Sequence, residues 1–152
     1  MAAKYIDWSK SPDTEKSGDF YKWKTGANRV RFVGAMFVYR HPWKNGAKTE
    51  RKVCLIDTED AAKGIQVASL KASVVDWLKT WIAENGVQPG SAEAPSFLVT
   101  RTGTGKDDTK YVCVSSKPFA IPAGIDVAKE EAKLEALCAK MEKGDDLPGE
   151  RL

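Results

Sequence analysis

A β-strand pattern runs through residues 29–40, where β-branched and aromatic residues alternate with arginines and other residues. Side chains alternate between the two faces of a strand, so every second residue shares an environment. One predicted face carries Arg29, Arg31, Val33, Phe37 and Tyr39. The other carries Val30, Phe32, Met36 and Val38. Gly34 interrupts the run, and we expect a bulge or bend there that shifts the alternation beyond it by one residue.

Turn-forming residues divide much of the remaining chain into further short strands. Lys24–Asn28 is a turn before the first strand, and 41–51 is a polar, basic loop after it. Further strands are predicted at 52–57, 65–69, 96–102 and 109–115. The connection 103–108, Gly-Thr-Gly-Lys-Asp-Asp, is rich in turn formers and predicts a hairpin.

An apolar stripe at helical spacing predicts a helix over residues 71–85. The stripe consists of Val74, Trp77, Leu78, Trp81 and Ile82. Gly86 follows as a C-terminal stop. Tryptophans at this spacing are typical of a core face rather than of a ligand site, so we expect Trp77 and Trp81 to be core.

A second helix is predicted near the C-terminus, after Pro118 and Pro122 end the sheet region. Asp126 is a natural N-cap for a helix that ends at Lys143, and Gly144 is the stop. The apolar side of this helix carries Val127, Leu134, Leu137, Cys138 and Met141.

The predicted order is three strands, a helix and two strands, which is the order of the OB-fold. We therefore predict a mainly β protein, with a five-stranded OB-fold barrel over residues 20–122. A helix lies between strands three and four, and a C-terminal helix occupies 123–143. OB-folds bind ligands over strands two and three, between the first-to-second and fourth-to-fifth loops. The segments 41–51 and 103–108 take those two loop positions.

Charge is unevenly distributed along the 152 residues, whose formal net charge is +3. Residues 1–125 carry 19 basic and 13 acidic side chains, and residues 126–152 carry five and eight. A basic body with an acidic end fits a protein that binds a polyanion. The polar residues 1–19 are expected to be a flexible N-terminal arm, and 144–152 a disordered, mildly acidic tail.

The densest signal lies in residues 20–54, which hold nine Lys/Arg, the single acid Glu50 and seven aromatic residues. Cations attract phosphates whatever the base sequence, and aromatic rings stack on bases that are not already stacked. The segment therefore indicates a surface for single-stranded nucleic acid. The alternative is a β-rich segment whose aromatics are core and whose cations are a solvated face.

Metal and catalytic chemistry are weakly represented. Cys54, Cys113 and Cys138 form no CxxC pair and are expected to be reduced and buried, and His41 is the only histidine. A zinc site would lack its usual four closely spaced ligands, so we expect neither metal nor cofactor. Carboxylates at 57–60 could hold Mg²⁺ for a nuclease, but such a cluster more often makes a turn. We expect no catalytic residues.

Three segments, taken in order, resemble a known family. Trp23-Lys-Thr-Gly-Ala-Asn28-Arg-Val-Arg31-Phe is similar to the opening of the single-stranded DNA-binding proteins of tailed bacteriophages. The similarity continues through the helix 71–86 and through Phe97–Gly105, followed by Thr109-Lys-Tyr111. The resemblance covers roughly residues 20–120. It implies an OB-fold that coats single-stranded DNA, with little sequence preference, in phage replication, recombination or repair.

Two departures from that family concern metal and partners. Some relatives carry a zinc ribbon after the first strand, whereas here only His41 and Cys54 stand in that region. Relatives also end in a strongly acidic tail that recruits replication proteins. Here Asp145-Asp146-Leu147-Pro148 is short and continues into Gly149–Leu152. Recruitment of replication or recombination proteins through this tail is therefore only an expectation by resemblance.

The sequence thus predicts a non-enzymatic single-stranded DNA-binding protein. The residues expected to contact nucleic acid are Arg29, Arg31, Phe37, Tyr39, Trp43, Lys44, Arg101, Lys106, Lys110 and Tyr111. Val30, Phe32, Trp77, Leu78 and Trp81 are expected to be core instead. The alternatives are an OB-like module that binds a host or replication protein, and a small metal-dependent nuclease or annealing accessory.

The location expected from the sequence is the cytoplasm, that of the host cell if a phage encodes the chain. No apolar run approaches the ~20 residues that span a bilayer, and none near residue 1 has the form of a signal peptide.

Overall fold

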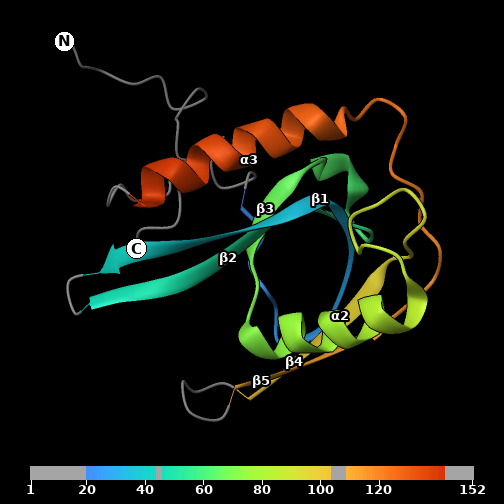
Figure 1. Cartoon of the computed structure of the whole chain (residues 1–152). Helices are drawn as coiled ribbons and strands as arrows, with labels where there is room; N and C mark the ends of the chain where they lie inside the picture. Colours follow the sequence, from blue (N-terminus) through green and yellow to red (C-terminus); the bar gives the residue numbers. More distant parts are fainter. Residues whose placement is uncertain (1–19, 44–45, 104–108, 143–152) are drawn as a thin grey trace, which may run out of the picture.

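A computed structural model describes residues 20–43, 46–103 and 109–142. The protein is mainly β, with a five-stranded antiparallel sheet in the order β3-β2-β1-β4-β5 (Figure 1). The strands are β1 (Gly26–Trp43), β2 (Gly46–Asp57), β3 (Gln66–Ser69), β4 (Phe97–Thr102) and β5 (Lys110–Ser115). The helices are α2 (Ala72–Asn85) and α3 (Val127–Glu142), with a short 3-10 turn η2 (Ala61–Lys63).

Most predicted elements are confirmed with their ends close to the predicted residues. Helix α2 ends at Asn85 and is capped by Gly86, which adopts the left-handed conformation (φ 67°) and donates its N–H to the Ile82 carbonyl. Helix α3 begins after Asp126, whose Oδ1 accepts the N–H of Lys129 at 3.2 Å. Caps of this kind depend on residues within one or two helical turns of each other, so the sequence predicts where the helices begin and end.

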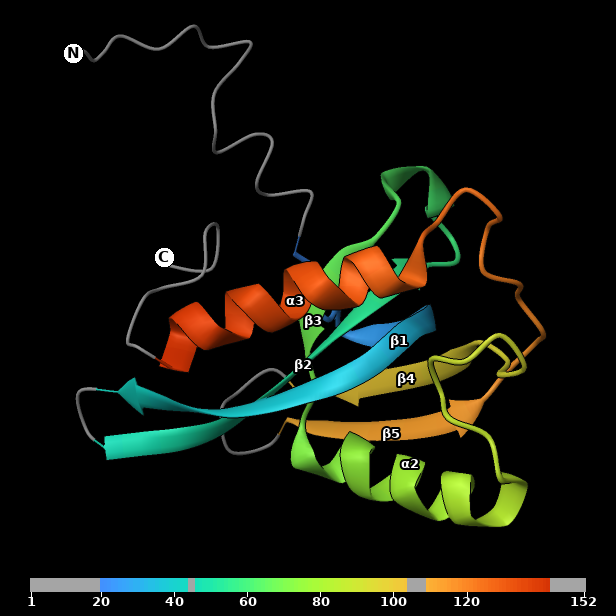
Figure 2. The same cartoon turned by 45° about the horizontal axis from the view of Figure 1, so that its top comes forward.

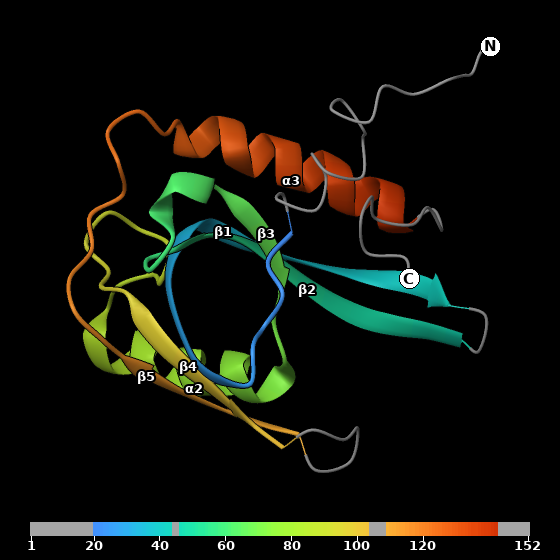
Figure 3. The same ribbon diagram turned by 180° about the vertical axis from the view of Figure 1, so that it is seen from behind.

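The predicted loop 41–51 is wrong, because most of it is strand. Strands β1 and β2 continue as a two-stranded ribbon, and their pairing runs to Trp43 opposite Gly46. The ribbon projects from one side of the molecule in Figures 1 and 3. The strand was not predicted because the residues of this segment are polar and basic and show no alternation of apolar residues.

Gly34 marks an irregularity in β1, as predicted, but the faces of the strand do not shift. The register passes from Val33 opposite Cys54 to Phe37 opposite Lys52, so four steps of β1 match two of β2. Two extra residues keep the alternation in phase, and Val33 and Tyr39 therefore lie in the same core cluster. Gly34 adopts φ 77°, which favours glycine.

The two helices cover the two faces of the sheet (Figure 2). Each helix and the sheet face beneath it form a separate core cluster. Val30 and Phe32 of β1 face α2, whose Leu78 and Trp81 are buried in the same cluster. Trp77, half-buried, completes this face, as expected of a core residue.

The opposite face of the sheet lies under α3. The buried residues of that cluster are Val33, Tyr39, Cys54, Ile56, Leu134, Cys138 and Met141. In Figure 2 α3 crosses β1 and β2 on the side opposite α2.

Strands β3 and β5 are the two edges of the sheet, and no strand pairing joins them among the described residues. Residues 20–25 run beside β3, where Phe20 forms a parallel bridge with Val67 (Figure 3). Trp23 donates its Nε1–H to the Ser69 carbonyl at 2.7 Å, and its own carbonyl accepts a hydrogen bond from Arg101 Nη1 at 2.8 Å. Trp23 thus links β3 to β4 through hydrogen bonds.

Helices long and apolar enough to span a bilayer are absent from the described part of the chain.

Candidate nucleic-acid interface

The Trp23–Asn28 motif is a turn organised by one buried side chain. Asn28 is 1% exposed, and its Oδ1 accepts the Tyr21 hydroxyl at 2.7 Å and the Lys24 N–H at 2.9 Å. Its amide nitrogen donates to the carbonyls of Lys24, Gly26 and Val99. Gly26, at φ 95°, supplies the turn's left-handed residue. The motif therefore fixes the backbone position of the exposed Lys24, and the exposed Lys22 lies two residues before it.

Arg31, expected to contact phosphate, lies inside the protein at 0% exposure. Its guanidinium donates to the carbonyls of Phe119 and Ser91, both at 2.6 Å, and to Phe32 at 2.7 Å. Longer contacts reach the carbonyls of Pro89 and Ala92. Burial lowers the pKa of Arg31 from its ordinary value, and Glu93 opposes that shift. The structure thus gives Arg31 a structural position, in which it joins β1 to two loops.

Tyr39 and Phe37 also point away from solvent on the α3 side of β1. Tyr39 is 4% exposed in the core cluster under α3, and Phe37 packs against that cluster, half-buried. Lys52, opposite Phe37, is buried as well, with Glu50 at 4.0 Å and Ser69 Oγ in contact. Because α3 covers this face, Tyr39 is left out of the candidate interface, together with Arg31.

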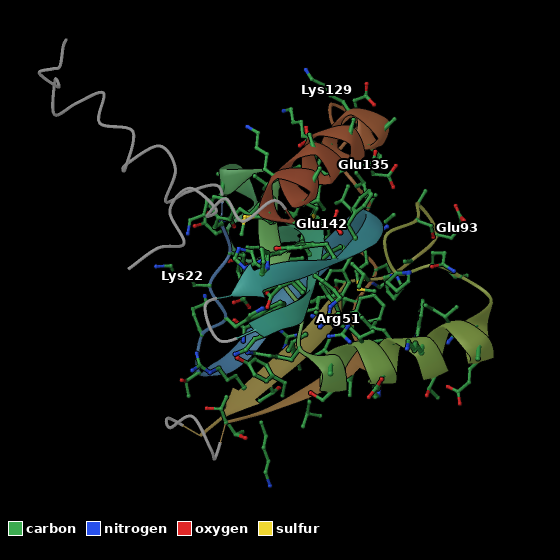
Figure 4. The ribbon with its side chains drawn as sticks, turned by 60° about the vertical axis from the view of Figure 1, so that its left-hand side comes forward. Lys22, Arg51, Glu93, Lys129, Glu135 and Glu142 are labelled. Carbon is green, nitrogen blue, oxygen red and sulfur yellow. The ribbon has the colours of Figure 1, made fainter. Side chains whose placement is uncertain are left out.

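A group of exposed and half-exposed basic residues lies where the β1–β2 ribbon and the β4–β5 hairpin end. Both strand pairs end on the same side of the molecule in Figures 1 and 3. We name this the hairpin-end surface and define it by the solvent-accessible cations of those strands, of residues 22–24 and of the start of α2. They are Lys22, Lys24, Arg40, Lys48, Arg51, Lys71, Arg101 and Lys110. Figure 4, which brings this side forward, shows Arg51 between the ribbon and α2, with Lys22 at the outer margin.

Two half-buried aromatic residues border this surface. Tyr111 pairs with Arg101 across β4 and β5, and Arg101 bonds the Trp23 carbonyl. The rings of Trp23 and Tyr21 meet edge to face with centroids 4.9 Å apart. The pairs therefore place partly accessible rings next to a guanidinium, as in sites that stack bases beside phosphate contacts.

Arg29 and the carboxylates after β2 lie away from the hairpin ends. Arg29 is half-exposed, with Glu59 at 3.6 Å and Ser116 Oγ at 3.1 Å. Asp57 Oδ1 accepts the Glu59 N–H, and Asp60 pairs with Lys63 at 3.4 Å. These acids make a turn and two ion pairs, and a turn is the arrangement that the sequence favoured for them.

Three predicted contact residues fall where no side chain is described. Lys44 and Lys106 lie outside the described residues, as does the side chain of Trp43. Of the predicted set, the hairpin-end surface and its border bring together Arg101, Lys110 and Tyr111. Six cations of this surface were not among the predicted contact residues: Lys22, Lys24, Arg40, Lys48, Arg51 and Lys71. For Arg51 the missing signal is the strand register, since it lies opposite Val38 on the face that α3 leaves open.

Chemistry other than charge is sparse in the described segments. Groups of three or more His, Cys, Asp or Glu placed to hold a metal ion do not occur there. All three thiols are free and buried. Burial raises the pKa of Cys54 and Cys113 to about 12 and that of Cys138 to about 11, so none is a thiolate at neutral pH.

Comparisons with protein-family models, curated proteins and solved structures gave no match to this chain.

Proposed function

We propose that this protein binds single-stranded DNA without sequence preference, through the hairpin-end surface. The observation that carries the proposal is the gathering of eight solvent-accessible cations from six separate segments on one side of the molecule. Such a surface contacts successive phosphates of a flexible DNA strand, while unstacked bases contact the accessible parts of Trp23 and Tyr111, which are half-buried. The protein acts by binding and not by catalysis.

The sheet order supports an OB-fold as the scaffold for this surface. Strand β1 is central and pairs with both β2 and β4, and α2 connects β3 to β4, which is the connectivity of a partly open OB barrel. In that fold the loops that end β1–β2 and β4–β5 border the ligand. Helix α3 covers the outer face of β1 and β2. We therefore place the single-stranded DNA between the two hairpin ends and not beneath α3.

The first test is a fluorescence-anisotropy titration of labelled oligo-dT, with duplex DNA and single-stranded RNA as competitors, at several salt concentrations. We expect tight binding to oligo-dT at low salt and a linear loss of log affinity with log salt, because each contacted phosphate releases counterions. Weak binding at low salt, or equal binding to duplex DNA, would overturn the proposal.

Charge variants locate the surface. Arg40→Gln, Arg51→Gln and Lys110→Gln should each weaken binding to every single-stranded sequence and reduce the salt slope by up to about one. Lys129→Gln is the matched control, since Lys129 is an exposed lysine on α3, on another part of the molecule (Figure 4). Variants at the hairpin ends that bind like Lys129→Gln would place the DNA elsewhere.

A further inference from the structure

A cavity of about 490 Å³ lies between α2 and the irregular part of β1. Its floor is apolar and consists of Phe32, Val53, Leu70, Val75, Leu78 and Ile82. Cavities of roughly 300–1,000 Å³ with mostly apolar walls and few polar groups are typical of binding sites. The residues that line the cavity are not part of the hairpin-end surface, although Arg40 and Arg51 of that surface lie next to its outer end.

The mouth of the cavity is built from backbone held in place by specific contacts. Gly34 donates its N–H to the Gly90 carbonyl at 2.9 Å, and a Cβ on Gly90 would lie 1.9 Å from the Gly34 oxygen. The next residue, Ala35, donates its N–H to Glu131 Oε2 of α3 at 2.7 Å. The two extra residues of β1 therefore form a fixed rim between loop 88–91 and α3.

An exposed apolar strip leads out of the mouth along β1. Met36 lines the cavity and is 37% exposed, and Val38, two residues further on the same face, is 55% exposed. An open mouth continuous with exposed side chains fits a segment of polypeptide lying along the strand better than an enclosed small molecule. Exposed apolar surface of this kind marks interaction sites.

Apart from Glu131, the charges beside the strip and the cavity are positive. Lys79 lines the cavity from α2, and Arg51 lies opposite Val38 on β2. Arg40 follows Val38 on the same face of β1. Glu131, the acid that lines the cavity, already accepts the Ala35 N–H. A complementary partner therefore carries carboxylates beside its apolar side chains.

We propose that this cavity is a docking site for an acidic segment of a partner protein, which inserts a large apolar side chain between α2 and β1. The carboxylates of the segment pair with Lys79 and Arg51, and its chain lies along Met36 and Val38. In this mode of recognition a peptide segment lies in a groove. One buried apolar side chain supplies most of the affinity, and the flanking charges set the specificity.

The test uses short fluorescein-labelled synthetic peptides and the full chain. The first peptide carries Phe and Leu among Asp and Glu, the second replaces its acids by Lys, and the third replaces its apolar residues by Ser. A fourth has the sequence of residues 143–152. We expect fluorescence anisotropy to show saturable binding of the first peptide alone. In NMR spectra of the protein, the same peptide should change the chemical shifts of Met36, Val75 and Ile82.

Two variants assign the binding to the cavity. Ala35→Trp fills the mouth and Lys79→Glu reverses the rim charge, and each should weaken the first peptide by at least about tenfold. The matched controls Ala139→Trp and Lys129→Glu change exposed positions of α3 and should bind it like the wild type. Ala35→Trp should keep its affinity for oligo-dT. Lys79→Glu keeps the test decisive if Ala35→Trp does not fold, because Lys79 is exposed.

Each other result overturns the proposal. If none of the first three peptides binds, the partner chemistry is wrong. Binding of the 143–152 peptide alone would assign the cavity to the tail of this chain. A parallel loss of peptide and oligo-dT binding in Ala35→Trp would make the cavity part of the DNA site.

Discussion

At the scale of single residues, Arg31 shows how a cation can serve the interior instead of a ligand. A guanidinium with five donors can satisfy several carbonyls at once, and here it does so for residues of β1, of loop 89–92 and of the segment at 119. The arginine in the Arg29-Val-Arg31 motif therefore holds loops together. Sequence alone does not separate this role from phosphate binding, because the same donors serve both.

Arg31→Met tests this role. Removing the guanidinium leaves buried carbonyls without donors, so we expect the free energy of unfolding to fall by about 3–5 kcal/mol. Urea denaturation measures the change, with Arg40→Met as the exposed control, which should change stability by less than about 0.5 kcal/mol. An Arg31→Met variant as stable as Arg40→Met would contradict the structural role.

Tyr111 tests stacking separately from charge. Tyr111→Leu keeps an apolar side chain against the core but removes the ring, so affinity for oligo-dT should fall by about 1–3 kcal/mol. The salt slope should stay that of the wild type, since no phosphate contact is lost. The measurement is the same anisotropy titration, and an unchanged affinity would exclude Tyr111 from base contact.

At the scale of elements, the position of loop 88–91 depends on one glycine. Gly90→Ala would place a methyl group 1.9 Å from the Gly34 carbonyl oxygen, so the loop must move away from β1. We expect a loss of at least about 2 kcal/mol in unfolding free energy, as in overpacked sites. Gly124→Ala is the matched control, since nothing lies within 4 Å of its added Cβ. Thermal unfolding of the two variants gives the comparison, and equal melting temperatures would refute the close contact.

Helix α3 is held to the sheet mainly by a few apolar side chains. Leu134 is 1% exposed between α3 and β1, whereas Leu137, on the same helix, is half-buried. Leu134→Ala should therefore cost about 2–5 kcal/mol and Leu137→Ala distinctly less. Chemical denaturation of both variants checks the difference. If the two substitutions cost the same, α3 does not dock as described.

At the scale of the whole molecule, buried thiols make stability depend on alkaline pH. Folding raises the pKa of Cys54 and Cys113 from the ordinary value of 9.0 to about 12, and that of Cys138 to about 11, chiefly by burial. The folded state therefore holds these protons longer than the unfolded state. The stabilisation is fully present below pH ~9 and is lost as the pH rises through the folded-state values.

We expect the free energy of unfolding to fall between about pH 9 and about pH 11, because the unfolded chain loses thiol protons first. Burial also raises the pKa of Tyr21, which adds to the same trend. Urea denaturation under reducing conditions measures the slope, and Cys113→Ala should make it shallower. A stability that rises over this range would contradict the burial of the thiols.

What the sequence determined by itself is local. The apolar stripe of α2, the glycine stop at Gly86, the Asp126 cap and the β4–β5 hairpin depend on neighbouring residues, and each was predicted close to its place. The core positions Val30, Phe32, Leu78 and Trp81 followed from periodicity, because burial imposes the same period on sequence and structure.

The tertiary structure alone decided which cations and rings stay accessible. Tyr39 and Lys52 are residue types found on ligand surfaces, but α3, some 75 to 100 residues later in the chain, covers them. Arg51 and Val38 are neighbours because of the register of the β1–β2 ribbon, which the polar sequence of residues 41–51 did not predict. The irregularity at Gly34 contains two extra residues, so the two faces of β1 stay in phase across it. The number of extra residues is decided by the pairing of β1 with β2, a distant segment, and therefore by the tertiary structure.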